Sequence, residues 1–94
     1  MMMNLGTTVM SRGIALKTGT SWIYKRFVED SLNKFINEDF GVISDEDKQT
    51  NIEALENGGM VMGAYIQGDV KIWIMREPDG KGSFVTTVLF PDEY

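Results

Sequence analysis

The sequence contains no cysteine and no histidine. Without cysteine the chain has no disulfide framework, thiol nucleophile, iron–sulfur cluster or cysteine zinc site. Without histidine it lacks the commonest general base and transition-metal ligand. These absences favour a small binding module over a catalyst. We therefore expect a protein that is not an enzyme and that carries no cofactor and no metal ion.

Long apolar runs are also missing from the sequence. The longest runs, such as Val88 to Phe90, span three or four residues, whereas a helix that crosses a bilayer needs roughly 20. The first residues, Met1 to Gly6, have no basic segment, apolar run or small-residue cleavage site, so they lack the pattern of a signal peptide. We expect a cytoplasmic protein that does not interact with membranes.

The length and composition indicate one folded domain. The chain has 94 residues, of which 43% are hydrophobic and 24% are charged, and these fractions are typical of a globule and not of a disordered chain. A chain of this length is too short for two full domains. We expect a single domain over residues 1–94, as a monomer or a homodimer.

Two helices are predicted in the middle of the chain. Apolar residues recur at spacings of three and four after Trp22, Thr20 or Ser21 can cap this segment, and Asp39-Phe40-Gly41 ends it. A second start signal, Ser44-Asp45-Glu46-Asp47, begins a helix that Asn57-Gly58-Gly59 ends. Before them, residues 5–14 indicate a short strand, and the glycines at 13 and 19 predict a loop.

The last third of the chain alternates with a period of two. Residues 60–66 and 70–75 form a predicted hairpin around Gln67-Gly68-Asp69, and the turn at residues 77–82 leads to a strand over residues 84–90. The predicted fold class is α+β, in the order β-α-α-β-β-β, with a three- to four-stranded antiparallel sheet packed on two helices. Pro91 ends the last strand, and the tail after it is either ordered or a frayed terminus.

Negative charge is concentrated in the helical part of the sequence. Nine basic and 14 acidic residues give a net charge of −5, but residues 27–57 alone carry nine acids and two lysines, a local charge of −7. Such a cluster repels nucleic acid and steers the protein towards basic surfaces. A second interpretation stays open for Asp45, Glu46 and Asp47, because acids in the first turn of a helix complement its dipole.

Catalytic and metal-binding interpretations of the acids have little support in the sequence. Residues 44–50 lack the central glycine and the ligand spacing of a calcium loop. Residues 79–83 lack the spacer between glycines that a phosphate-binding loop has, so a turn explains them better. A chain this short also leaves little room for two carboxylates across a glycosidase cleft.

Trp73 is the aromatic residue that the alternation singles out. Strict alternation predicts that Met60, Met62, Ile72 and Ile74 face the helices, whereas Val61, Tyr65 and Trp73 share the opposite face. That face would be covered by the N-terminal segment or would form a surface for dimerisation or binding.

Part of the sequence resembles a family of small proteins of phages, plasmids and integrative elements, often called "plasmid-related". The resemblance covers about 60 residues. It is carried by the opening Ser11–Ile14, by Asp45–Lys48, Asn51, Ala54-Leu55, Gly58-Gly59, Tyr65 and Lys71–Ile74, and above all by the closing Thr86-Thr87-Val88-Leu89-Phe90-Pro91-Asp92-Glu93-Tyr94. The chain departs from the family at residues 37–42, where relatives have a tryptophan, and at residues 75–78. The resemblance implies a mobile-element setting, in which inhibitors of host defence are common.

Two functions from different classes are therefore predicted. The first is a non-enzymatic anti-defence inhibitor of the anti-CRISPR type, in the bacterial host cytoplasm. It would bind a basic surface of a host defence effector and would not bind nucleic acid directly. The second is an accessory interaction or regulatory module of a mobile element that acts through the apolar sheet face. The candidate partner-binding residues are Glu38, Asp39, Asp45, Glu46, Asp47, Glu53, Glu56 and Trp73.

Overall fold

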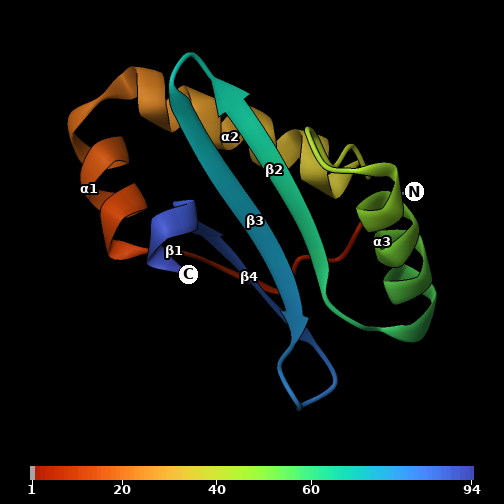
Figure 1. Ribbon diagram of the computed structural model, residues 1–94. Helices are drawn as coiled ribbons and strands as arrows, with labels where there is room; N and C mark the ends of the chain where they lie inside the picture. The colour runs from red at the N-terminus through yellow and green to blue at the C-terminus, as the bar shows by residue number, and fades with distance from the viewer. Residues whose placement is uncertain (1) are drawn as a thin grey trace.

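A computed structural model describes residues 2–94 as three helices beside one four-stranded sheet (Figure 1). The elements in chain order are β1 (Thr7–Met10), α1 (Arg12–Thr20), α2 (Trp22–Ile36), α3 (Asp45–Asn57), β2 (Val61–Gln67), β3 (Val70–Pro78), β4 (Phe84–Leu89) and the short 3₁₀ helix η1 (Pro91–Glu93). The strand order is β1-β4-β3-β2. The predicted α+β class is confirmed.

Two details of the predicted architecture are wrong. The sheet is mixed and not antiparallel, because β1 runs parallel to β4 while the β2–β3 and β3–β4 pairs are antiparallel. The number of helices is three and not two, because the predicted loop after β1 is the helix α1. No helix formed by residues 2–94 combines the length and apolarity that crossing a bilayer requires.

The helices α2 and α3 begin where the sequence predicts, and α3 also ends there, whereas α2 ends at Ile36, before the predicted stop at Asp39. The Ser21 side chain caps α2 by accepting a hydrogen bond from the Tyr24 N–H, and the Ser44 side chain caps α3 by accepting one from the Asp47 N–H. Gly58 ends α3 in the left-handed conformation, with φ of 74°, which glycine adopts at little cost. Local capping chemistry is therefore sufficient to place both helices.

The helix α1 forms because distant residues support it. Ser11 caps it, and its buried Ile14 belongs to the hydrophobic core. The Glu93 carboxylate accepts hydrogen bonds from the Ser11 hydroxyl at 2.6 Å and from the Gly13 N–H at 2.9 Å. The two glycines favour a loop here, but hydrogen bonds to a residue 80 or more positions along the chain stabilise the helix instead.

The hairpin between β2 and β3 reverses part of the predicted face assignment. Gln67 pairs with Val70 around a two-residue turn, so Tyr65 lies opposite Ile72 and Ala64 lies opposite Trp73. The sequence interpretation placed three residues in this turn, and a shift of one residue moves every side chain of a strand to the other face. Val61 and Tyr65 therefore face the helices, while Met62 shares the outer face with Trp73.

The core lies between the sheet and the helices α1 and α2, which cover one face of it in Figure 1. The helix α3 lies beside β2 at the edge of the sheet. Phe35 packs edge-on against Phe40 with ring centroids 6.0 Å apart. The buried cluster consists of Met3, Ile14, Phe27, Val28, Phe35, Phe40, Val61, Tyr65, Ile72, Ile74 and Val88.

The N-terminal segment lies on the helix side of the sheet. Met3 is buried in the core, and its N–H donates to the Ile36 carbonyl. The buried Arg76 guanidinium donates to the Asn4 carbonyl at 3.2 Å and lies 3.8 Å from the centroid of the Phe84 ring. Of the two alternatives for Trp73, cover by this segment is therefore wrong, because Trp73 is on the opposite face.

Candidate interaction surface

The outer face of α3 carries a row of carboxylates. At about 100° per residue, Asp45, Glu46, Glu53 and Glu56 lie between about 120° and 220° from the buried Asn51 around the helix. All four side chains are exposed. Ile52 lies at the margin of the same face and is 47% exposed. The structure thus brings four of the eight candidate residues together on one solvent-facing surface, which we call the α3 acidic face.

Asp47, Glu38 and Asp39 lie away from the α3 acidic face. Asp47 lines a small hollow between α3 and the β2 edge. Glu38 follows α2 with a φ of 64°, and the Asp39 carboxylate accepts a hydrogen bond from the Gly41 N–H at 3.1 Å. These three acids therefore do not belong to the α3 acidic face.

Asn51 fixes α3 to the sheet. Its amide nitrogen donates to the Met62 carbonyl at 2.7 Å, and its amide oxygen accepts from the Met62 N–H at 3.1 Å. Asn51 is only 4% exposed. It therefore occupies the place that a neighbouring strand would take, and it holds the α3 acidic face in a fixed orientation. Sequence reasoning noted Asn51 only as part of the family resemblance.

The segment before α3 is fixed to the same strand edge. The Phe40 carbonyl accepts from the Ala64 N–H at 3.0 Å, and the Val42 N–H donates to the Ala64 carbonyl at 2.8 Å. The Tyr65 hydroxyl donates to the Asp39 carbonyl at 2.7 Å. Burial, and to a smaller extent the Asp39 carboxylate, raises the pKa of Tyr65 above its ordinary value of 10.0, so this hydroxyl remains a donor at neutral pH.

None of the carboxylates of the α3 acidic face forms an ion pair in the described part of the chain. Within residues 2–94 the one ion pair joins Arg26 and Asp30 at 3.4 Å, both on α2. The described chain contains no group of three or more acidic side chains close enough to hold a metal ion. The α3 acidic face thus carries four unpaired carboxylates, and Lys48 is the one base of α3.

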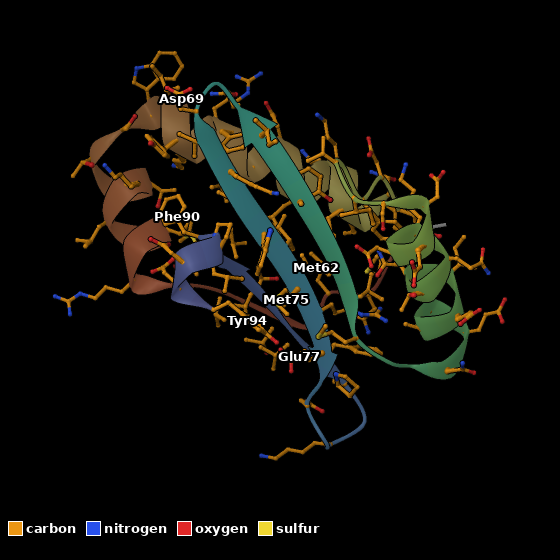
Figure 2. All side chains as sticks on the ribbon, viewed as in Figure 1. Met62, Asp69, Met75, Glu77, Phe90 and Tyr94 are labelled. Atoms are coloured by element: carbon orange, nitrogen blue, oxygen red, sulfur yellow. The ribbon has the colours of Figure 1, made fainter. Side chains whose placement is uncertain are left out.

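Trp73 lies opposite Ala64 in the register of β2 and β3, on the face of the sheet that points away from α1 and α2. It is partly buried, and its ring packs edge-on against Tyr94 with centroids 5.9 Å apart. Figure 2 shows Met62, Met75, Glu77 and Tyr94 on the side turned to the viewer, where no helix covers β2 and β3. Trp73 and the acids therefore belong to two separate surfaces.

The C-terminal tail is ordered, as one of the two sequence interpretations had it. Glu93 also accepts a hydrogen bond from the Phe90 N–H at 2.8 Å, which closes η1. These hydrogen bonds lower the pKa of the Glu93 carboxyl, and the bond from the Ser11 hydroxyl has the largest effect. Sequence reasoning missed Glu93, since nothing local relates it to residues 11–13.

Comparison of the chain with models of known families, with curated proteins and with solved structures gave no match. The resemblance to proteins of phages and plasmids therefore stays a prediction, and the functional proposal below depends on the geometry of the surface.

Proposed function

We propose that this protein is a non-catalytic inhibitor of a bacterial defence effector, of the anti-CRISPR type. The α3 acidic face binds the basic surface on which the effector holds nucleic acid. The resemblance to mobile-element proteins supplies the biological setting, and the surface supplies the chemistry. Lysine and arginine side chains that neutralise phosphates pair equally well with a fixed row of carboxylates.

The position of Glu53 and Glu56 carries this proposal. Asp45 and Glu46 stand in the first turn of α3, where the helix dipole favours acids. Glu56 stands in the last turn, where the dipole favours bases, and α3 has no base there. Capping therefore explains the first pair of acids and leaves the second pair unexplained. A binding surface for a cationic partner explains both pairs.

The experiment compares the double variant Glu53→Gln/Glu56→Gln with the wild type. Removing two charges from an interface should weaken inhibition of the effector about tenfold or more at low salt, and the wild-type advantage should shrink at high salt. The readouts are plaque formation on a strain with an active CRISPR system and target-DNA binding by the purified effector complex. The matched control is Glu77→Gln/Asp69→Asn, which loses the same charge at exposed positions outside α3.

Two results would reject the proposal. One is an equal loss of inhibition in the α3 variant and in the control, since this would mean that only net charge matters. The other is a wild-type protein that protects phage from none of a panel of defence systems. Helix content measured by circular dichroism should be unchanged, because glutamine and glutamate have similar helix propensities.

A further inference from the structure

The two edges of the sheet differ in whether their outward backbone N–H and C=O groups have hydrogen-bond partners. Along β2, the outward N–H and C=O groups of Met62 bond to Asn51, and those of Ala64 bond to Phe40 and Val42. Along β1, all four residues are exposed, and within residues 2–94 no segment pairs with the outer side of this strand. One edge is therefore closed and the other is open.

The open edge has four free backbone groups. The Ser11 N–H donates to the Val88 carbonyl of β4, and in a parallel pair alternate residues turn to the same neighbour. Residues 9 and 11 therefore bond inward, and the N–H and C=O groups of Thr8 and Met10 point outward. Edge strands are usually protected by proline, lysine or a bulge. The sequence Thr7-Thr8-Val9-Met10 contains neither proline nor a charge.

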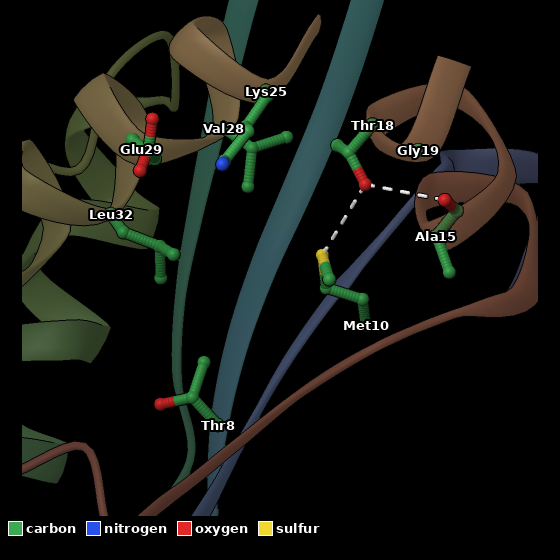
Figure 3. A pocket seen from close by; sticks show the side chains of 9 residues that line it. All are labelled: Thr8, Met10, Ala15, Thr18, Gly19, Lys25, Val28, Glu29 and Leu32. Atoms are coloured by element: carbon green, nitrogen blue, oxygen red, sulfur yellow. Dashed lines mark hydrogen bonds between the residues drawn. The ribbon is translucent and has the colours of Figure 1, made fainter. Parts of the chain in front are cut away.

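An apolar groove of about 550 Å³ lies next to this edge. Figure 3 shows Lys25, Val28, Glu29 and Leu32 of α2 on one side of it and Ala15, Thr18 and Gly19 of α1 on another, with Thr8 and Met10 of β1 pointing into the space between. Side chains alternate across a strand, so a strand added to β1 would direct every second side chain into the groove.

We propose that β1 and this groove bind an extended peptide segment of a partner protein by strand addition. Main-chain hydrogen bonds to Thr8 and Met10 hold the peptide, and apolar side chains at alternate positions fill the groove. The peptide as a whole carries a net negative charge, which the basic N-terminal part of this chain attracts. Residues 2–26 contain four bases, Arg12, Lys17, Lys25 and Arg26, and no acid. Glu29 is the one acid that lines the groove.

A second copy of this chain fits the edge less well. Two copies that pair at β1 would bring their basic N-terminal parts, residues 2–26, towards each other, and like charges at an interface are unfavourable. They would also leave two grooves to be filled by Thr8 and Met10 alone, and unfilled apolar space is unfavourable. A peptide with a net negative charge and apolar residues at alternate positions avoids the charge repulsion and fills the groove.

The test is selection of peptides from a phage-displayed library of random octapeptides against the full-length protein. We expect enriched peptides that have apolar residues at alternate positions and a net negative charge, and that protect the Thr8 and Met10 amides from hydrogen exchange. Thr8→Pro removes an outward N–H and should weaken binding at least about tenfold. Its melting temperature should change by less than about 4 °C, because proline is tolerated where an edge N–H faces solvent.

Two further variants make the result decisive. Val9→Pro removes an inward N–H and should lower the melting temperature by about 8 °C or more, which checks the assigned direction of the backbone groups. Ala15→Glu places a carboxylate in the groove at an exposed position and should weaken binding without affecting folding.

Four outcomes would overturn the proposal. The first is enrichment of no peptide, and the second is binding that neither Thr8→Pro nor Ala15→Glu weakens. The third is a wild-type dimer that Thr8→Pro dissociates, because a second copy would then occupy the edge. Enrichment of only basic peptides that require Glu53 and Glu56 would also reject it, while supporting the separate proposal for the α3 acidic face.

Discussion

At the scale of single residues, Asn51 shows how one side chain can replace a strand. Its amide satisfies both backbone groups of Met62, and it does so from a buried position. A buried polar group that loses its partner costs about 1–3 kcal/mol. The stability of the α3 attachment should therefore depend strongly on this side chain.

We predict that Asn51→Ala lowers the free energy of unfolding by about 2–3 kcal/mol, because two backbone groups of Met62 lose their partner. Urea denaturation followed by circular dichroism measures this loss. Asn57→Ala, at an exposed position in the last turn of α3, is the control and should change stability by less than about 0.5 kcal/mol. A loss in Asn51→Ala no larger than in the control would mean that α3 is held by its apolar contacts alone.

Glu93 makes the stability of the fold dependent on pH. Hydrogen bonds to the ionised carboxylate lower its folded pKa below the ordinary 4.5. The stabilisation is therefore present above about pH 4.5 and is lost as the pH falls through the folded pKa. The variant Glu93→Gln has no charge to lose.

We predict that the wild type melts at a higher temperature than Glu93→Gln at pH 7, and that the two melting temperatures converge as the pH is lowered below 4.5. Thermal denaturation at a series of pH values measures the difference. A difference that stays constant down to pH 2 would contradict the role of the ionised carboxylate.

At the scale of elements, α1 depends on η1. The last residues cap the first turn of α1 through Glu93, while Tyr94 is 78% exposed and touches only the Trp73 ring among the aromatic side chains. Removal of the tail should therefore act on α1 and not through lost burial of Tyr94.

We predict that deleting residues 92–94 speeds hydrogen exchange in residues 12–20 and leaves exchange in α3 unchanged. Tyr94→Ala is the control. It removes the ring but keeps Glu93, and it should leave α1 protected. Equal exchange in both variants would contradict the dependence of α1 on Glu93.

The elements also differ in how well the sequence predicts them. The helices α2 and α3 and the strands β2 to β4 combine a clear period with local caps or turn residues, and all five were predicted. The helix α1 was missed because its support comes from Glu93 and from burial of Ile14. The faces of β2 were assigned wrongly because the side chains that face the core depend on whether the turn at Gly68 has two residues or three. The local sequence pattern identifies the acids of the candidate site. It does not show that four of them share one solvent-facing surface, because this depends on how α3 is oriented on the sheet.

At the scale of the whole molecule, the charge divides between two ends. The helix α1 and the first turns of α2 contain only basic charges as far as Arg26, and α3 with the segment before it is acidic. Figure 1 places α1 and α3 at opposite ends of the sheet. The net charge of −5 is therefore unevenly distributed, and the molecule has a basic pole at α1 and an acidic pole at α3. Each pole adjoins one sheet edge, the closed edge at α3 and the open edge near α1.

The pairing of β1 with β4 and the capping of α1 by Glu93 also constrain how the protein folds during synthesis. Residues 7–10 pair with residues 85–88, and Gly13 bonds to Glu93. Contacts of such long sequence separation slow folding. Residues 7–13 thus lack these partners while the ribosome still holds the last ten residues, and β1 stays an unpaired strand until then. A chaperone that binds unpaired extended segments would therefore bind this protein at β1.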